Sequence, residues 1–256
     1  MKVTILGSGS SGGVPLIGCD CHVCTSEEPK NKRTRVSVLV EYKETKILID
    51  TSPDLRQQAL ANHIKSVDAV LYTHAHADHT HGIDELRSFN FHRNAQIPIY
   101  GDKPTLEEVT KRFDYVFGPP MPEYGWFRAS LVPHEITAYQ PFSIDDIEVV
   151  PFAQDHGRSN SMGFRIGDFA YSTDAKHIPE ASFEVLNGVK YWIVDCLSRH
   201  AKPTHAHLDL ALEWIARVKP EKAILTHMGH DFEYHTLKVE LPSHIEPAYD
   251  NLSFEL

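Results

Sequence analysis

The sequence lacks long apolar runs and is poor in positive charge. No stretch approaches the roughly twenty apolar residues that a membrane helix requires, and Met1 and Lys2 lead directly into a strand-like run at 3–6. We therefore expect a soluble, cytoplasmic protein with no membrane contact. The 25 Lys and Arg residues against 35 Asp and Glu residues give a formal net charge of −10. This charge argues against nucleic acid as a partner.

Cysteine is also scarce, and its placement argues against disulfide bonds. Of the four cysteines, Cys19, Cys21 and Cys24 lie close together and Cys196 stands alone. Such crowding in a reducing compartment favours metal ligation. A chain of 256 residues can bury a substantial core without covalent staples. No linker or tandem repeat divides it, so we expect one domain over residues 1–256.

The apolar pattern predicts two β-rich halves that carry helices on the outside. Strands are expected at 3–6, 36–41, 46–49, 68–72, 97–100, 142–152, 163–166, 170–172, 191–195 and 223–226. Helices are expected from about 54, then at 83–91, 103–117, 179–186 and 208–218. This pattern predicts an α+β fold in which two sheets pack face to face between outer helices, an αββα four-layer sandwich.

One connection breaks the pattern. Residues 118–128 contain three prolines together with Tyr124, Trp126 and Phe127. Such a segment could be a lid, plain surface packing, or an oligomer contact that would make the protein a homodimer. The sequence leaves these alternatives open.

The strongest chemical signal is the string T-H-A-H-A-D-H, which follows the predicted strand 68–72. It brings His74, His76, Asp78 and His79 together in one short loop. Imidazole nitrogens and carboxylate oxygens suit zinc, manganese or iron, and a loop at a strand end lets alternate side chains turn toward one point. A polar surface loop is the plainer interpretation, but this density of ligands favours a metal site.

Further candidate ligands stand just after three other predicted strands. His156 follows the strand that ends at 152, Asp174 follows the strand 170–172, and His227 follows the strand 223–226. Each alone would be an ordinary loop residue. Together they are what a site of two metals at one edge of a sandwich requires.

The cysteine cluster has the spacing C-x-C-x-x-C, which can supply three thiolates to one tetrahedral zinc. A fourth ligand must come from elsewhere. We expect His230, because it lies in the same loop as His227 in the string L-T-H-M-G-H; His22 and Cys196 are the alternatives. Such a zinc would tie the N-terminal loop to the edge that carries the histidines. Three buried free thiols are the competing interpretation.

The motif H-x-H-x-D-H, with the later His, Asp and His residues, resembles the metallo-β-lactamase superfamily over nearly the whole chain. The resemblance implies the metallo-β-lactamase fold and two catalytic divalent metals, Mn²⁺ or Zn²⁺. It implies that one metal is bound by His74, His76 and His156, the other by Asp78, His79 and His227, and that Asp174 bridges them. It also implies that Asp50 orients a ligand histidine, although a turn cap explains Asp50 equally well.

The chain resembles more narrowly the PhnP-type phosphodiesterases, which are related to the tRNase Z nucleases. The shared elements are G-C-x-C-x-x-C, T-H-x-H-x-D-H, L-T-H-x-x-H and the H-x-D-L that begins at His207. This resemblance implies one structural Zn²⁺ at the cysteines and a metal-dependent hydrolysis of small, often cyclic, phosphodiesters. The partner would then be a small-molecule substrate.

The expected mechanism places a hydroxide between the metals as the nucleophile. His207 matches the family's catalytic histidine and precedes the predicted helix 208–218. We therefore expect His207 to protonate the leaving alkoxide, with Asp78 as part of the catalytic centre. His205 is the alternative acid.

Two other kinds of function compete with this one. The same scaffold could serve a lactonase, a thioesterase or a tRNA 3′-processing nuclease, although the sequence has no long basic, glycine-rich arm for holding tRNA. The chain could also be a metal-binding module without turnover. The ligands suit manganese and zinc alike, so the sequence does not choose between them.

Overall fold

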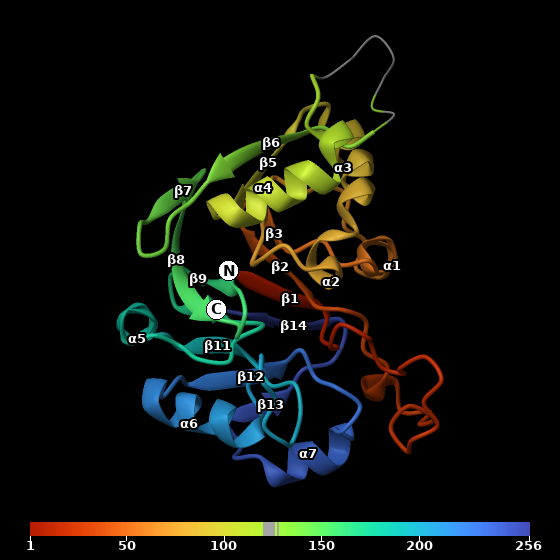
Figure 1. The fold of residues 1–256 in the computed structure, drawn as a ribbon, viewed down its shortest axis with the longest axis vertical. Helices are drawn as coiled ribbons and strands as arrows, with labels where there is room; N and C mark the ends of the chain where they lie inside the picture. Colours follow the sequence, from red (N-terminus) through yellow and green to blue (C-terminus); the bar gives the residue numbers. More distant parts are fainter. Residues whose placement is uncertain (120–125, 127) are drawn as a thin grey trace.

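The strands of the computed structural model form two mixed sheets, each with seven strands among the residues it describes, 1–119, 126 and 128–256 (Figure 1). The first sheet has the order β14-β1-β2-β3-β4-β5-β6 and the second the order β13-β12-β11-β10-β9-β8-β7. The first comprises β1 (Lys2–Gly7), β2 (Ser37–Tyr42), β3 (Thr45–Ile49), β4 (Ala69–Leu71), β5 (Ile97–Gly101), β6 (Leu131–Glu135) and β14 (Leu252–Glu255). The second comprises β7 (Phe142–Ile144), β8 (Ile147–Asp155), β9 (Asn160–Ile166), β10 (Phe169–Tyr171), β11 (Tyr191–Asp195), β12 (Lys222–Thr226) and β13 (Ile245–Pro247).

Helices cover the outer faces of the two sheets (Figure 1). Beside the first sheet lie α1 (Leu55–Ala61), the short α2 (Ala77–Thr80), α3 (Leu86–Arg93) and α4 (Lys103–Arg112). Beside the second lie α5 (Glu180–Leu186), α6 (Leu208–Val218) and α7 (Tyr234–Glu240). Single turns of 3-10 helix occur at Pro29–Asn31, Ile83–Glu85 and Asp114–Val116. The predicted αββα sandwich is confirmed.

The alternation of side chains along the strands explains these layers, because successive side chains of a strand point to opposite faces of its sheet. In β2, Val38 and Val40 belong to the core shared with Phe152 and Phe164 of the second sheet. The intervening Leu39 belongs to a separate core with the residues of α3 and α4. One strand therefore contributes to both the central interface and the outer helix layer.

Parallel pairing brings several loop residues to one edge of the sandwich. In the first sheet β3 pairs in parallel with β4, and in the second β10, β11 and β12 pair in parallel. The carboxyl ends of parallel strands lie side by side. Asp50, His74, Asp174, Asp195 and His227 stand at or just after these ends, so the fold gathers them in one place.

Some predicted boundaries were wrong. The helix predicted over 103–117 ends at Arg112, and the 3-10 turn Asp114–Val116 follows after Phe113 leaves the helical backbone geometry. The strand predicted over 163–166 begins at Asn160, which pairs with Asp155 at the end of β8. The range predicted as strand over 142–152 is divided into β7 and β8. The strands β6, β13 and β14 and the helices α2 and α7 were not predicted.

The aromatic connection 118–128 lies mostly outside the described residues, including Tyr124 and Phe127. Trp126 is described, and its Nε1 donates to the side-chain oxygen of Asn94 at 3.1 Å. Among the helices that the structure describes, none is long and apolar enough to span a bilayer.

Candidate metal centre

The predicted catalytic ligands form one cluster with two adjacent sets, and four of them make up the first set. They are His74, His76, His156 and Asp174, and one nitrogen or oxygen from each lies within 4.8 Å of all the others. His76 Nδ1 is 2.8 Å from His74 Nε2 and 3.3 Å from His156 Nε2. Asp174 Oδ2 lies 3.7 Å from His74 Nε2 and 3.4 Å from His156 Nε2. Three imidazoles and a carboxylate around one point suit a divalent metal.

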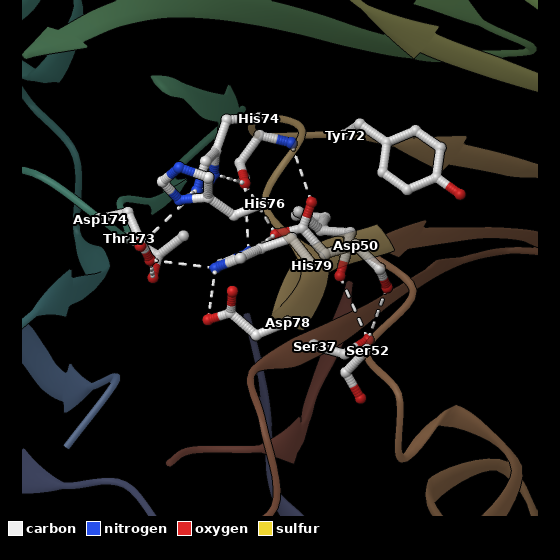
Figure 2. Close-up of polar contacts among 12 residues, drawn as sticks. Ser37, Asp50, Ser52, Tyr72, His74, His76, Asp78, His79, Thr173 and Asp174 are labelled. Carbon is white, nitrogen blue, oxygen red and sulfur yellow. Dashed lines mark hydrogen bonds and ion pairs between the residues drawn. The ribbon is translucent and has the colours of Figure 1, made fainter. Parts of the chain in front are cut away.

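The second side of the cluster contains Asp78, His79, His227 and again Asp174, with the same 4.8 Å limit between their ligand atoms. His79 Nε2 is 3.3 Å from Asp78 Oδ2 and 3.2 Å from Asp174 Oδ1. His227 Nε2 is 3.5 Å from Asp78 Oδ2 and 3.4 Å from Asp174 Oδ1. Asp174 therefore turns one oxygen to each set, and Figure 2 shows His79 in contact with both Asp174 and Asp78. All seven predicted catalytic ligands meet here.

Three buried ring nitrogens of this cluster have no hydrogen-bond partner within the described chain. They are Nε2 of His79 and both nitrogens of His227. The two Nε2 atoms face the carboxylates of Asp78 and Asp174. A buried polar atom without a partner is costly, and metal coordination is one way to satisfy it. The donor set thus fits two divalent metals.

Three residues of the site adopt left-handed backbone conformations directly after strands. The φ angles are 61° for Asp50, 51° for Asp174 and 57° for His227. Asp and His tolerate this region better than bulky residues, but it remains a disfavoured conformation for them. Such strain persists where the surroundings hold it, and it clusters at functional sites. Here it turns three side chains out of the strand direction and toward the centre.

Asp50 lies fully buried behind the motif. Its Oδ1 accepts from the Thr73 amide at 2.8 Å, and its Oδ2 accepts from Thr73 Oγ1 at 2.8 Å and lies 2.7 Å from His79 Nδ1 (Figure 2). With Nδ1–H donated to Asp50, the Nε2 of His79 is left to face the cluster. On the other side, the Nδ1 of His156 is held in the same way by the Thr204 carbonyl at 2.7 Å.

The protonation preferences of the histidines follow their surroundings. Burial and repulsion from His79 hold the pKa of His74 well below its usual range, which favours the neutral form that binds metals. Desolvation by the surrounding residues also lowers the pKa of His76, although His76 is the exposed member of this set. Burial acts in the same direction on His227, but the carboxylates of Asp174 and Asp78 outweigh it and raise the pKa of His227 to about 9. A metal at this position would therefore have to displace a proton from His227.

The predicted acid His207 is not at the cluster; His205 is. His205 Nε2 lies 3.8 Å from Asp174 Oδ2, and its ring stacks on His227 with a centroid distance of 4.8 Å. Within the described residues, the His207 ring makes no hydrogen bond, ion pair or ring contact with the metal-ligand set, and its Nδ1 is buried without a partner. His207 is fixed elsewhere because it pairs with Ser198 in a short bridge and then caps α6.

Asp195 is a functional candidate that the sequence did not single out. Its Oδ2 accepts from the amides of Ala175 and Ala206 at 3.0 and 3.2 Å and lies 3.3 Å from His205 Nδ1. Its Oδ1 lies 3.8 Å from His227 Nδ1. Asp195 ends a predicted strand, so the rule that found Asp174 and His227 could have found it too.

The cysteine cluster also closes as predicted. His230 Nδ1 lies 3.2 Å from Cys19 Sγ, 3.4 Å from Cys21 Sγ and 3.7 Å from Cys24 Sγ. One atom from each of the four residues lies within 4.8 Å of the others. A hydrogen bond from the Cys24 amide, helped by Cys19 and His230 against burial, lowers the pKa of Cys21 to about 6. Three thiols and an imidazole at these separations suit a tetrahedral zinc, and neither His22 nor Cys196 belongs to the group.

Comparison with known proteins places the chain in a family. The model of the Beta-lactamase superfamily domain matches residues 45–228. A crystal structure of a diphosphatase from the PhnP family has a TM-score of 0.92 and 36% sequence identity, covering 100% of this chain and 97% of that one. The chain belongs to the metallo-β-lactamase superfamily, in its PhnP-type branch.

This PhnP-type chain is also similar to an octanoyltransferase in sequence and to a PqqB protein in fold. An octanoyltransferase of Porphyromonas gingivalis is 38% identical over 256 residues, which are 98% of this chain and 51% of the relative. The chain thus spans about half the length of that curated relative. The Zn²⁺-bound PqqB of Methylobacterium extorquens has a TM-score of 0.78 at 20% identity, covering 100% of both chains, and shows the shared fold. Together, the family and the clustered ligands support a metallo-β-lactamase-fold hydrolase that uses divalent metals.

The contact between Asp50 and His79 predicts how metal affinity depends on a residue outside the ligand set. Asp50→Asn keeps the size of the side chain but removes the charge that holds the His79 ring. We expect the affinity for a divalent metal to fall about 10- to 100-fold, measured by competition with a chromophoric chelator. Asp68→Asn is the control, because Asp68 binds the Lys46 amide and Arg93 instead. Equal affinities in Asp50→Asn and the unmodified protein would contradict the orienting role.

Proposed function

We propose that this protein is a metal-dependent phosphoric diester hydrolase that acts on small molecules. One observation carries the proposal: two ligand sets share Asp174, and the pair formed by His205 and Asp195 stands beside them. Two adjacent metals and a nearby acid are what in-line displacement at phosphorus uses. The 36% identity to a PhnP-family diphosphatase supports phosphoryl chemistry in particular.

In this proposal His74, His76 and His156 hold one metal, and Asp78, His79 and His227 hold the other, with Asp174 between them. Two bound divalent metals would supply an activated water and would stabilise charge on the phosphoryl oxygens. Manganese and zinc both suit this donor set. A separate zinc at Cys19, Cys21, Cys24 and His230 would be structural.

His205 is the general acid of the proposed mechanism. Its side chain is 12% exposed, so it borders solvent while its Nε2 faces the cluster. Donation of Nδ1–H to Asp195 holds the ring in one orientation and leaves Nε2 as the atom that can carry a proton to the substrate. Protonation of the leaving alkoxide from Nε2 would then complete the cleavage of the phosphorus–oxygen bond. Asp195 acts through His205 and is a positioning residue.

The main competing activities are ester hydrolyses on the same fold. A lactonase or a thioesterase could use the same metals, because they also need an activated water. A tRNA-processing nuclease is disfavoured by the net charge of −10, which repels a polyanion. The transferase activity of the Porphyromonas gingivalis relative belongs to a chain about half of which has no counterpart here.

A panel of substrates tests the proposal directly. The protein loaded with Mn²⁺ or Zn²⁺ is assayed with bis-p-nitrophenyl phosphate, a 2′,3′-cyclic nucleotide, a lactone, a thioester and a pre-tRNA. We expect turnover of the two phosphodiesters and none above background with the lactone and the thioester. The reverse pattern would replace the proposed function by a carboxylic ester or thioester hydrolase. Inactivity on the whole panel would favour a metal-binding module.

The proposal of His205 rather than His207 as the acid gives a second prediction. His205→Ala removes the group beside Asp174, so kcat for bis-p-nitrophenyl phosphate should fall about 10²- to 10⁴-fold. His207→Ala is the matched control, two residues away in sequence but outside the cluster, and should keep kcat within about tenfold. Metal analysis of both variants separates a lost acid from a lost metal. A larger loss of kcat in His207→Ala than in His205→Ala would assign the general acid to His207.

The cysteine cluster gives a third prediction. Cys21→Ala removes one of the four clustered ligands, so the purified protein should lose the structural zinc and unfold more easily. The measurement is zinc per chain by elemental analysis, together with a thermal denaturation curve. Cys196→Ala, which removes a buried thiol outside the group, should keep its zinc. If Cys196→Ala loses zinc and Cys21→Ala does not, the assignment of the ligands is wrong.

A further inference from the structure

A cavity of about 610 Å³ lies between the N-terminal loop and the turn that leads into β14. The segments 14–15 and 29–34 line it on one side and the segment 249–251 on the other. Figure 1 shows the N-terminal loop, in red, beside α7, to which it is joined by the contact of Glu28 with His235 at 2.8 Å. The clustered histidines and carboxylates of the metal centre do not line this cavity.

Three cationic side chains line the cavity, those of Lys30, Lys32 and Arg33. The chain as a whole has an excess of acidic residues, yet none of these three takes part in the ion pairs formed by the residues that the structure describes. The Nζ of Lys32 has only the Cys24 carbonyl near it, at 3.4 Å. This side of the molecule therefore holds positive charge that the protein does not neutralise at short range.

The ammonium group of Lys30 is held in place by aromatic rings. Its Nζ lies 4.4 Å from the ring centroid of Tyr234 and 4.3 Å from that of Tyr249, and it donates to the Tyr234 hydroxyl at 3.3 Å. Rings at this distance attract a cation without neutralising it. An ammonium group has three donors, so Lys30 keeps donors for a ligand in a fixed position.

Arg33 places a buried positive charge beside the cavity, since its side chain is only 1% exposed. It donates to the Gly229 and Phe232 carbonyls, while its Nε has no partner in the described chain. Burial outweighs the attraction of Asp250 and lowers the pKa of Arg33 to about 10. A buried charge is costly unless an opposite charge lies close to it, and an anion in the cavity would supply one.

Asp250 is the one carboxylate in the lining, and its oxygens are already used. Its Oδ1 accepts from the amide and the hydroxyl of Ser8, both at 3.0 Å. Its Oδ2 accepts from the amide and the hydroxyl of Thr34, at 2.7 and 2.6 Å. Four donors therefore offset the charge of Asp250, and the balance of charge around the cavity stays positive.

We propose that this cavity is a second ligand site, separate from the metal centre, for the doubly charged phosphate group of a small molecule. Lys30 and Lys32 would donate to its oxygens, and Val14 and Pro15 offer an apolar surface to the rest of the molecule. The bonds from Arg33 to Gly229 and Phe232 join the site to the loop that carries a ligand of each metal cluster. The proposal does not depend on which reaction the metal centre catalyses.

Hydrogen exchange followed by mass spectrometry tests the site without turnover. The metal-loaded protein is titrated with methylphosphonate, a dianion above neutral pH that is stable to hydrolysis, and with methanesulfonate, which has the same shape and one charge. We expect methylphosphonate to slow the exchange of amides in 30–34 and 249–251, at a concentration about tenfold lower than methanesulfonate requires. Slower exchange at 74–79 alone would place the anion on the metals and overturn the proposal.

Substitution of Lys32 supplies the matched comparison. Lys32→Gln should raise the methylphosphonate concentration needed to protect 249–251 about tenfold, because it removes a charged donor, and Lys32→Arg should restore the protection. Lys65→Gln removes an exposed lysine that does not line the cavity and should leave the titration unchanged. Equal titrations for Lys32→Gln and the unmodified protein would overturn the proposal, as would equal losses in Lys32→Gln and Lys65→Gln.

Discussion

The arrangement of this site depends on one buried carboxylate, that of Asp174. It stands between imidazoles from both halves of the sandwich: His74 and His79 follow β4, whereas His156 and His227 follow β8 and β12. A buried carboxylate is costly unless it is paired. Burial raises its pKa, but the surrounding histidines, led by His227, outweigh that effect and hold the pKa of Asp174 well below its usual range. The carboxylate of Asp174 therefore links histidines that follow strands of both sheets.

Two further buried carboxylates hold histidine rings in place around Asp174. Asp50 holds His79 from the first sheet, and Asp195 holds His205 from the second. Thr73 and Ala175 fix those carboxylates in turn through backbone amides. His79 and His205 thus each have Nδ1 against a buried carboxylate and Nε2 turned to the centre. Divalent metals at the centre would replace the protons that now balance these carboxylates.

The N-terminal loop is fastened to the same centre. The buried Arg33 donates to the carbonyls of Gly229 at 3.2 Å and Phe232 at 2.7 Å, and Met228 exchanges backbone hydrogen bonds with Ser8 and Ser10. The segment held in this way carries both His227 and His230. A zinc at the cysteines would therefore stabilise a ligand loop of the catalytic centre without taking part in the reaction.

The sequence predicted which residues meet in the cluster, because these residues stand where periodic patterns end. Buried strands are recognisable from their apolar runs, and a ligand just after such a strand needs only the sheet to bring it to its partners. His205 and His207 could not be separated in this way. Both lie in an irregular segment before α6. Their orientation follows from backbone hydrogen bonds that join Ala206 to Leu197 and Leu208 to Ser198, and no periodic pattern in the sequence indicates these bonds.

The strands that the sequence missed share a physical cause. β6, β13 and β14 are all edge strands, and edge strands are paired on one side and can tolerate proline and polar residues. Pro133 lies in β6 and Pro247 in β13, while β14 alternates partly buried and exposed side chains. Their identity is therefore set by the neighbouring strand rather than by their own composition.

The helix α4 contacts the loop that carries the histidine motif. Arg112 near its end donates to the carbonyl of Ala75, which lies between the ligands His74 and His76. Asp102, the residue just before it, lines a cavity that His74 and His76 also line. A ligand in this cavity would therefore contact a helix that also holds the motif loop. The motif loop is thus held from two directions, by Arg112 of α4 through the Ala75 carbonyl and by the buried Asp50 through Thr73 and His79.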